Sequence, residues 1–98
     1  MKNIYIGKSK INGRGLFTTD DLKNGDVIGV SHVVHDNVWY QVFPIGIFYN
    51  HSENPNCIVE TKGNINLVIA SRDIVSDEEL VVDYTKQPYL EQPGKDWK

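Results

Sequence analysis

The fold of this chain is decided by the stretch Asn-His-Ser-Glu-Asn-Pro-Asn-Cys at residues 50–57. It follows directly on the apolar run Ile-Gly-Ile-Phe-Tyr at residues 45–49. Polar side chains and a proline placed directly after such a run fit neither an ordinary core strand nor an ordinary loop. Downstream, Glu-Leu-Val-Val-Asp-Tyr at residues 79–84 ends a strand-like run with an acid and a tyrosine. These two segments therefore predict a functional site.

The polar side chains of the two segments have a functional and a structural interpretation. Asn50 and His51 can hold a polar ligand, because an Asn offers donors and an acceptor and a neutral His offers one of each. Alternatively they belong to a capped turn, in which nearby side chains satisfy local amides and Pro55 fixes the bend. Tyr84 is either a group that acts on a substrate or a half-buried aromatic with its hydroxyl at the rim. The residues alone leave both interpretations open.

A third segment of interest is Gly13-Arg14-Gly15, within a turn predicted over residues 11–15. Glycines permit positive φ angles and let the backbone approach a ligand closely. A plain hairpin turn explains the same residues. The segment is not a nucleotide-binding fingerprint, since the third glycine and the following helix are missing.

The remaining pattern predicts a mainly β chain with little helix. No stretch keeps a helical period over a dozen residues, so we expect at most a short helical turn around residues 44–49. Asn24-Gly25 predicts a tight turn, and a second turn at residues 62–64 lies inside a predicted hairpin. Residues 22–26 and 74–78 share one rhythm, which predicts two similar units. The predicted strands cover residues 4–6, 16–19, 27–34 with a glycine bulge, 38–43, 58–61, 65–70 and 79–84.

Length and composition bound the function. The 98 residues form a single predicted domain, with a core at about 4–89 and a tail at 85–98. A net charge of −3 disfavours nucleic acid as a partner and suits a basic peptide better. The single cysteine excludes a disulfide framework and fits a reducing compartment. No N-terminal run is long enough for a signal peptide or a membrane span.

No metal site is expected. The chain has three histidines, and they lack the spacing of metal ligands. Cys57 stands alone and is most simply a buried or half-buried thiol.

Taken in order, the three segments resemble the SET domain of protein lysine methyltransferases, of the small free-standing viral and microbial type. The family pattern Asn-His-Ser-x-x-Pro-Asn is present at residues 50–56, and Glu-Glu-Leu-x-x-Asp-Tyr at residues 78–84. Gly-x-Gly-Leu-Phe is present at residues 13–17, and Asp77 stands where glycine is common. The resemblance implies a β-clip-like fold of short sheets with a C-terminal pseudoknot, which places the Asn-His and Asp-Tyr motifs side by side.

The resemblance also implies an activity and a site. It implies methyl transfer from S-adenosylmethionine to a lysine side chain of a protein or peptide, with S-adenosylhomocysteine as the product. The reaction would be an in-line displacement, with Tyr84 as the catalytic residue that orients the methyl group. The cofactor-binding residues implied are Arg14, Gly15, Asn50, His51 and Tyr89. The residues implied for the lysine channel are Val82, Tyr49 and Ser31.

The chain departs from the family pattern at several positions. Glu53 stands where zinc-binding members place a cysteine, so the tail, with Tyr89 and Trp97, would have to close the channel. The insert between residues 34 and 48 is short, which puts peptide selectivity in doubt. Ser31 stands where several members have a second channel tyrosine. Val82 stands where an aromatic residue often influences the number of methyl groups added, so this number cannot be inferred.

Because of these departures, two alternatives to an enzyme stay open. One is a catalytically weak SET-like module that binds the cofactor or a lysine-containing peptide. The other is a structural or interaction domain of β-clip type, in which the Asn-His turn is only scaffold. For the enzyme, we expect an intracellular location, cytoplasmic or, in a eukaryotic host, nuclear. We expect no direct contact with nucleic acid or membrane, and a homodimer is compatible with the sequence.

Overall fold

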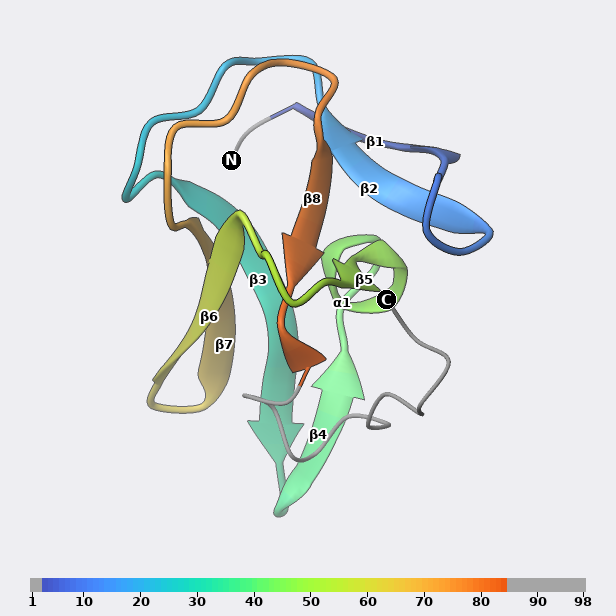
Figure 1. The fold of residues 1–98 in the computed structure, drawn as a ribbon. Coiled ribbons are helices and arrows are strands. Elements are labelled where there is room, and N and C mark those ends of the chain that lie inside the picture. Colours follow the sequence, from blue (N-terminus) through green and yellow to red (C-terminus); the bar gives the residue numbers. More distant parts are fainter. Residues whose placement is uncertain (1–2, 85–98) are drawn as a thin grey trace.

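The architecture consists of two small β-sheets and one short helix, seen in a computed structural model that describes residues 3–84. The strands of one sheet lie in the order β1-β2-β8-β5, and those of the other in the order β4-β3-β7-β6 (Figure 1). The elements are β1 (Ile4–Lys8), β2 (Arg14–Thr18), β3 (Val27–His35), β4 (Val38–Gln41), α1 (Ile45–Phe48), β5 (Asn50–His51), β6 (Cys57–Lys62), β7 (Ile65–Ala70) and β8 (Glu79–Val82). The predicted mainly β class is confirmed.

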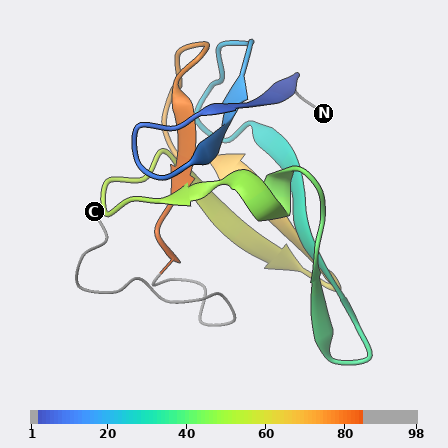
Figure 2. The same ribbon diagram turned by 90° about the vertical axis from the view of Figure 1, so that its right-hand side faces the viewer.

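The second sheet, β4-β3-β7-β6, forms from antiparallel hairpins whose turns the sequence marks. β6 and β7 pair from Cys57↔Ala70 to Lys62↔Ile65, around Gly63 with its positive φ of 59°. In β3 the register against β7 shifts between Val27 and Gly29, which confirms the predicted glycine bulge. Figure 2 shows the β3–β4 hairpin extending away from the first sheet.

The two similar units predicted at residues 22–26 and 74–78 are confirmed, and they pair with each other. Leu22 and Ile74 exchange backbone hydrogen bonds of 2.8 and 2.9 Å, and the two connections run side by side in Figure 1. Both units also reach a left-handed φ, 95° at Gly25 and 65° at Asp77. An Asp tolerates this region better than most residues, which explains how Asp77 replaces the common glycine.

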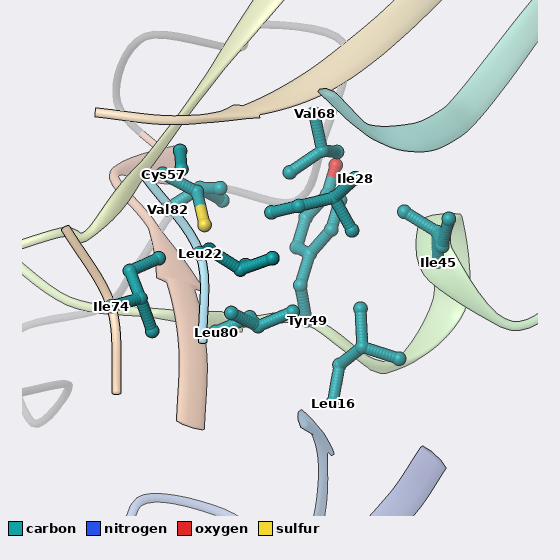
Figure 3. Packing of buried hydrophobic residues seen from close by; sticks show 11 residues of the cluster. Leu16, Leu22, Ile28, Ile45, Tyr49, Cys57, Val68, Ile74, Leu80 and Val82 are labelled. Carbon is teal, nitrogen blue, oxygen red and sulfur yellow. The ribbon is translucent and has the colours of Figure 1, made fainter. Parts of the chain in front are cut away.

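The core lies between the two sheets (Figure 3). Leu22 and Ile74 enter it from the paired turns, and Tyr49 enters it directly after α1. Each fully buried aliphatic side chain contributes roughly 1.5–3 kcal/mol of transfer free energy. Cys57 is a free, buried thiol within this cluster, as predicted, and burial raises its pKa to about 12. The remaining core members are Leu16, Ile28, Ile45, Val68, Ala70, Leu80 and Val82.

Some predicted boundaries are wrong by a few residues. The turn predicted over residues 11–15 ends at Gly13, and Arg14 and Gly15 already pair in β2 with Lys8 and Gly7. β4 ends at Gln41, two residues before the predicted Phe43. The helical turn predicted at 44–49 is the four-residue helix α1. The tail at 85–98, with Tyr89, Trp97 and the predicted pseudoknot threading, lies outside the described residues.

Candidate active site

The segment at residues 50–57 and the Asp-Tyr motif at residues 83–84 are brought together by a parallel strand pair. β5 lies beside β8, with Asn50 opposite Val81 and His51 opposite Val82 (Figures 1 and 2). The amide of Ser52 extends the pairing by donating to the carbonyl of Val82 at 3.0 Å. Since β8 also pairs with β2, three segments far apart in the sequence meet at this strand. The predicted adjacency of the two motifs is confirmed.

Tyr84 follows β8 and is anchored at both of its ends. Its backbone amide donates to Nδ1 of His51 at 3.0 Å, and its hydroxyl donates to the carbonyl of Tyr49 at 2.6 Å. The first bond requires Nδ1 to be an acceptor, so the neutral ring of His51 carries its proton on Nε2. The rings of Tyr84 and His51 lie with their centroids 5.2 Å apart. This double anchoring fixes the position of the phenol oxygen.

The protonation state of Tyr84 follows from its surroundings. Burial, together with the nearby negative charge of Glu79, raises the pKa of the Tyr84 phenol to about 12. The phenol is therefore neutral at physiological pH. Its proton is donated to the carbonyl of Tyr49.

Asn50 is buried, and the nitrogen of its side chain makes the hydrogen bonds to neighbouring groups of the chain. Nδ2, with its two N–H groups, faces four acceptors: Oε2 of Glu79 at 2.8 Å, the hydroxyl of Ser9 at 3.1 Å, and the carbonyls of Arg14 and Asn12 at 3.2 and 3.3 Å. Among the described residues, all side-chain hydrogen bonds of Asn50 run through Nδ2. The opposite end, Oδ1, is thus left as an acceptor for a ligand.

The Gly-x-Gly segment contributes backbone to this site. The carbonyl of Arg14 contacts Asn50, while the Arg14 side chain is exposed. A side chain at Gly15 would overlap the carboxylate of Glu79, so the missing Cβ makes room for that group. The structure thus shows a hairpin turn at Gly13 and a close approach of the Gly15 backbone to Glu79, while the approach to a ligand stays a prediction.

The three predicted channel residues, Tyr49, Val82 and Ser31, are all buried. Tyr49 and Val82 belong to the core cluster against which Tyr84 packs, and the rings of Tyr49 and Tyr84 lie 6.0 Å apart. Ser31 is also buried, but its hydroxyl contacts the carbonyl of Asn66 and Nδ1 of His32. Its own carbonyl accepts the amide of Val42, close to α1. Ser31 therefore stays a predicted channel residue that the structure places against α1.

Three residues of the site were missed as functional groups by the sequence reasoning. Ser9 and Glu79 hold Asn50, and Asn56 binds the backbone of β8. Glu79 and Asn56 stand inside the quoted motifs, so their position was visible although their role was not. Ser9 had no such signal, because only the fold brings it to Glu79.

Neither a metal centre nor a membrane span is visible in the described part of the chain. Residues 3–84 contain no group of three or more His, Cys, Asp or Glu side chains that could hold a metal ion. No helix in this range has the length and apolar character needed to cross a bilayer.

Comparisons with known proteins identify the family. The chain belongs to the SET domain family, whose model matches residues 35–85. Over 46 residues, 47% of the chain, it is 46% identical to SET6 of Saccharomyces cerevisiae, which is described as a potential protein lysine methyltransferase. That match spans only 12% of the yeast protein.

Solved structures give the same fold. A candidate histone methyltransferase of Plasmodium falciparum superposes with a TM-score of 0.71 at 28% identity, covering 86% of this chain and 94% of that one. The Polycomb Repressive Complex 2 of Chaetomium thermophilum, in a structure bound to S-adenosylmethionine, gives a TM-score of 0.67 at 17% identity. This second match covers 85% of this chain and 15% of the other, and it supports the fold alone.

Proposed function

We propose that this protein transfers a methyl group from S-adenosylmethionine to a lysine side chain of a protein or peptide. Membership of the SET family supports a methyltransferase. The observation that carries the proposal is the doubly anchored Tyr84, whose neutral hydroxyl lies against Tyr49 and beside His51. A net charge of −3 suits a basic peptide as the methyl acceptor.

The residues of the site fit this cofactor. Because Nδ2 of Asn50 is taken by the chain, Oδ1 can accept from a ligand amine, and S-adenosylmethionine carries an amino group. Asn50, His51 and the backbone at Arg14 and Gly15 would hold it, together with Tyr89 of the tail. When bound, the cofactor supplies a methyl carbon attached to a positively charged sulfur.

Tyr84 acts in this proposal as an orienting group and not as a general base. A phenol whose pKa is raised to about 12 and whose proton is donated to Tyr49 does not ionise near neutral pH. Its oxygen can accept C–H···O contacts from a polarised methyl group, each worth about 0.5–1 kcal/mol. Most of the rate would come from positioning of nucleophile and carbon.

The lysine amine must lose its proton before it can attack, since a free lysine titrates near ~10.4. Tyr49 and Val82 belong to the buried cluster against which Tyr84 packs, and they would make the wall of a lysine channel there apolar. Such a surface disfavours the charged ammonium form and lowers the pKa of an amine that enters it. The channel walls would thus help to deliver a neutral nucleophile.

Calorimetric titration with S-adenosylhomocysteine tests the cofactor site. We expect micromolar binding by the wild-type protein and its loss in Asn50→Ala, because this change removes the Oδ1 acceptor. Asn54→Ala is the matched control, since Asn54 is exposed in the same segment and should bind as the wild type does. Equal binding by wild type and Asn50→Ala would contradict the assigned pocket, and no binding by the wild type would contradict the proposed function.

A further inference from the structure

We propose that Ser9 and Glu79 are positioning residues that hold the Asn50 amide in one orientation for ligand binding. This inference rests on the proposed function, since it concerns the pocket in which Asn50 would contact the cofactor. It assigns a role to two residues outside the Asn-His and Asp-Tyr pairs.

The chemistry of the partners fixes the direction of the Asn50 amide. A carboxylate and a backbone carbonyl can only accept hydrogen bonds, and these groups account for three of the four contacts, from Glu79, Arg14 and Asn12. The nitrogen end must therefore face them. The contact to Glu79 is the shortest at 2.8 Å and involves a charged acceptor, which makes it the strongest of the set.

Ser9 connects this amide to the loop between β1 and β2. Its hydroxyl donates to the Glu79 carboxylate, with 2.8 and 2.9 Å to the two oxygens. The same oxygen accepts the backbone amides of Ile11 at 2.9 Å and Asn12 at 3.2 Å. One hydroxyl thus sets the loop conformation that presents the Asn12 and Arg14 carbonyls to Asn50.

The result is a closed triangle of Ser9, Glu79 and Asn50 that ties β8 and β5 to the β1–β2 loop. Without the Glu79 carboxylate, the Asn50 amide loses its strongest restraint and can rotate. A rotated amide would present a donor where the ligand amine needs an acceptor. The orientation of Asn50, more than its presence, then determines the affinity of the pocket.

The test compares matched variants by calorimetric titration with S-adenosylhomocysteine. We expect Ser9→Ala and Glu79→Gln to weaken binding about tenfold or more, because a charge-assisted bond restrains the amide. Ser9→Thr keeps a hydroxyl and should restore binding. Glu78→Gln makes the same chemical change one residue away, where the carboxylate faces Arg72 and Asn56, and should bind like the wild type.

Two further readouts separate positioning from a purely structural role. Hydrogen exchange of the Ile11 and Asn12 amides should accelerate in Ser9→Ala, because both lose their acceptor, while the melting temperature of the variant stays close to that of the wild type. An affinity loss that only follows a lowered melting temperature would overturn the inference. Wild-type affinity in both Ser9→Ala and Glu79→Gln, with binding lost in Asn50→Ala, would overturn it and leave the proposed function standing.

Discussion

At Tyr84, a single phenol proton determines what the side chain can do. The hydroxyl donates this proton to the carbonyl of Tyr49, and burial raises the pKa of the phenol to about 12. The oxygen of the neutral phenol can accept hydrogen bonds, but it cannot abstract a proton near neutral pH. The pH dependence of the proposed methyl transfer should therefore follow the lysine amine and not this tyrosine.

Replacing Tyr84 by Phe tests this role. We expect kcat to fall on the order of a hundredfold, because a positioned oxygen at the reacting carbon is lost. Affinity for S-adenosylhomocysteine should stay within about threefold of the wild type, since Asn50 and His51 remain. The rise of the rate with pH should keep its shape in the variant. Methylation is followed by mass spectrometry of a lysine peptide.

Tyr5→Phe is the control for this prediction, because the hydroxyl of Tyr5 also donates one hydrogen bond, to Asp77 at the surface. Unchanged turnover in Tyr84→Phe would remove Tyr84 from the reaction. A wild type that binds S-adenosylhomocysteine but methylates none of a wide set of lysine peptides would favour the catalytically weak module.

At the scale of elements, a buried side chain completes the backbone pairing of β8. Asn56 accepts the amide of Val81 at 2.9 Å and donates to the carbonyl of Glu79 at 2.7 Å. It also accepts a weak bond from the Cys57 thiol at 3.3 Å. The Asn56 side chain thus makes two hydrogen bonds with the β8 backbone of the kind that a neighbouring strand would make.

Asn56→Ala should lower the free energy of unfolding by about 3 kcal/mol, because it leaves a buried N–H and a part-buried carbonyl without their partners. Urea denaturation measures this loss. Asn54→Ala removes an exposed amide two positions earlier and should change the stability little. A loss in Asn56→Ala no larger than that of the control would show that the bridge contributes nothing to stability.

Elements and their partners differ in how well the sequence predicts them. The strands, the glycine bulge and the hairpin at Gly63 follow from alternation and turn residues, which act locally. β5 has only two residues, so no periodic pattern can reveal it. Its place beside β8 was predicted only through the family resemblance. The role of Ser9 depends on a contact across 70 residues of sequence, which no local pattern encodes.

At the scale of the whole molecule, a buried histidine links stability to pH. His32 lies in the core, with its Nδ1 2.9 Å from the hydroxyl of Ser31 and its ring near those of Trp39 and Tyr49. Burial lowers its pKa from the ordinary value of 6.5. The unfolded chain therefore binds a proton more readily than the folded one as the pH falls below about 6.5.

The folded state should accordingly lose stability as the pH falls from about 6.5 towards the lowered pKa of His32. We expect the urea midpoint of the wild type to be lower at pH 5 than at pH 7.5. His32→Gln should reduce this difference, whereas His35→Gln should leave it, because the side chain of His35 is 76% exposed. An equal pH dependence in wild type and His32→Gln would assign the effect to other groups.

The parallel pairing of β5 with β8 has a consequence for biosynthesis. The His51–Tyr84 contact joins residues 33 positions apart, and β8 is also the strand with which β2 pairs. Because a ribosome delivers a chain from its N-terminus, every earlier part of the site emerges before the strand that assembles it. A nascent chain that ends before β8 holds the motif of residues 50–57 without the strand that pairs with it. The proposed site is thus complete only once β8, the last strand of the described residues, has been translated.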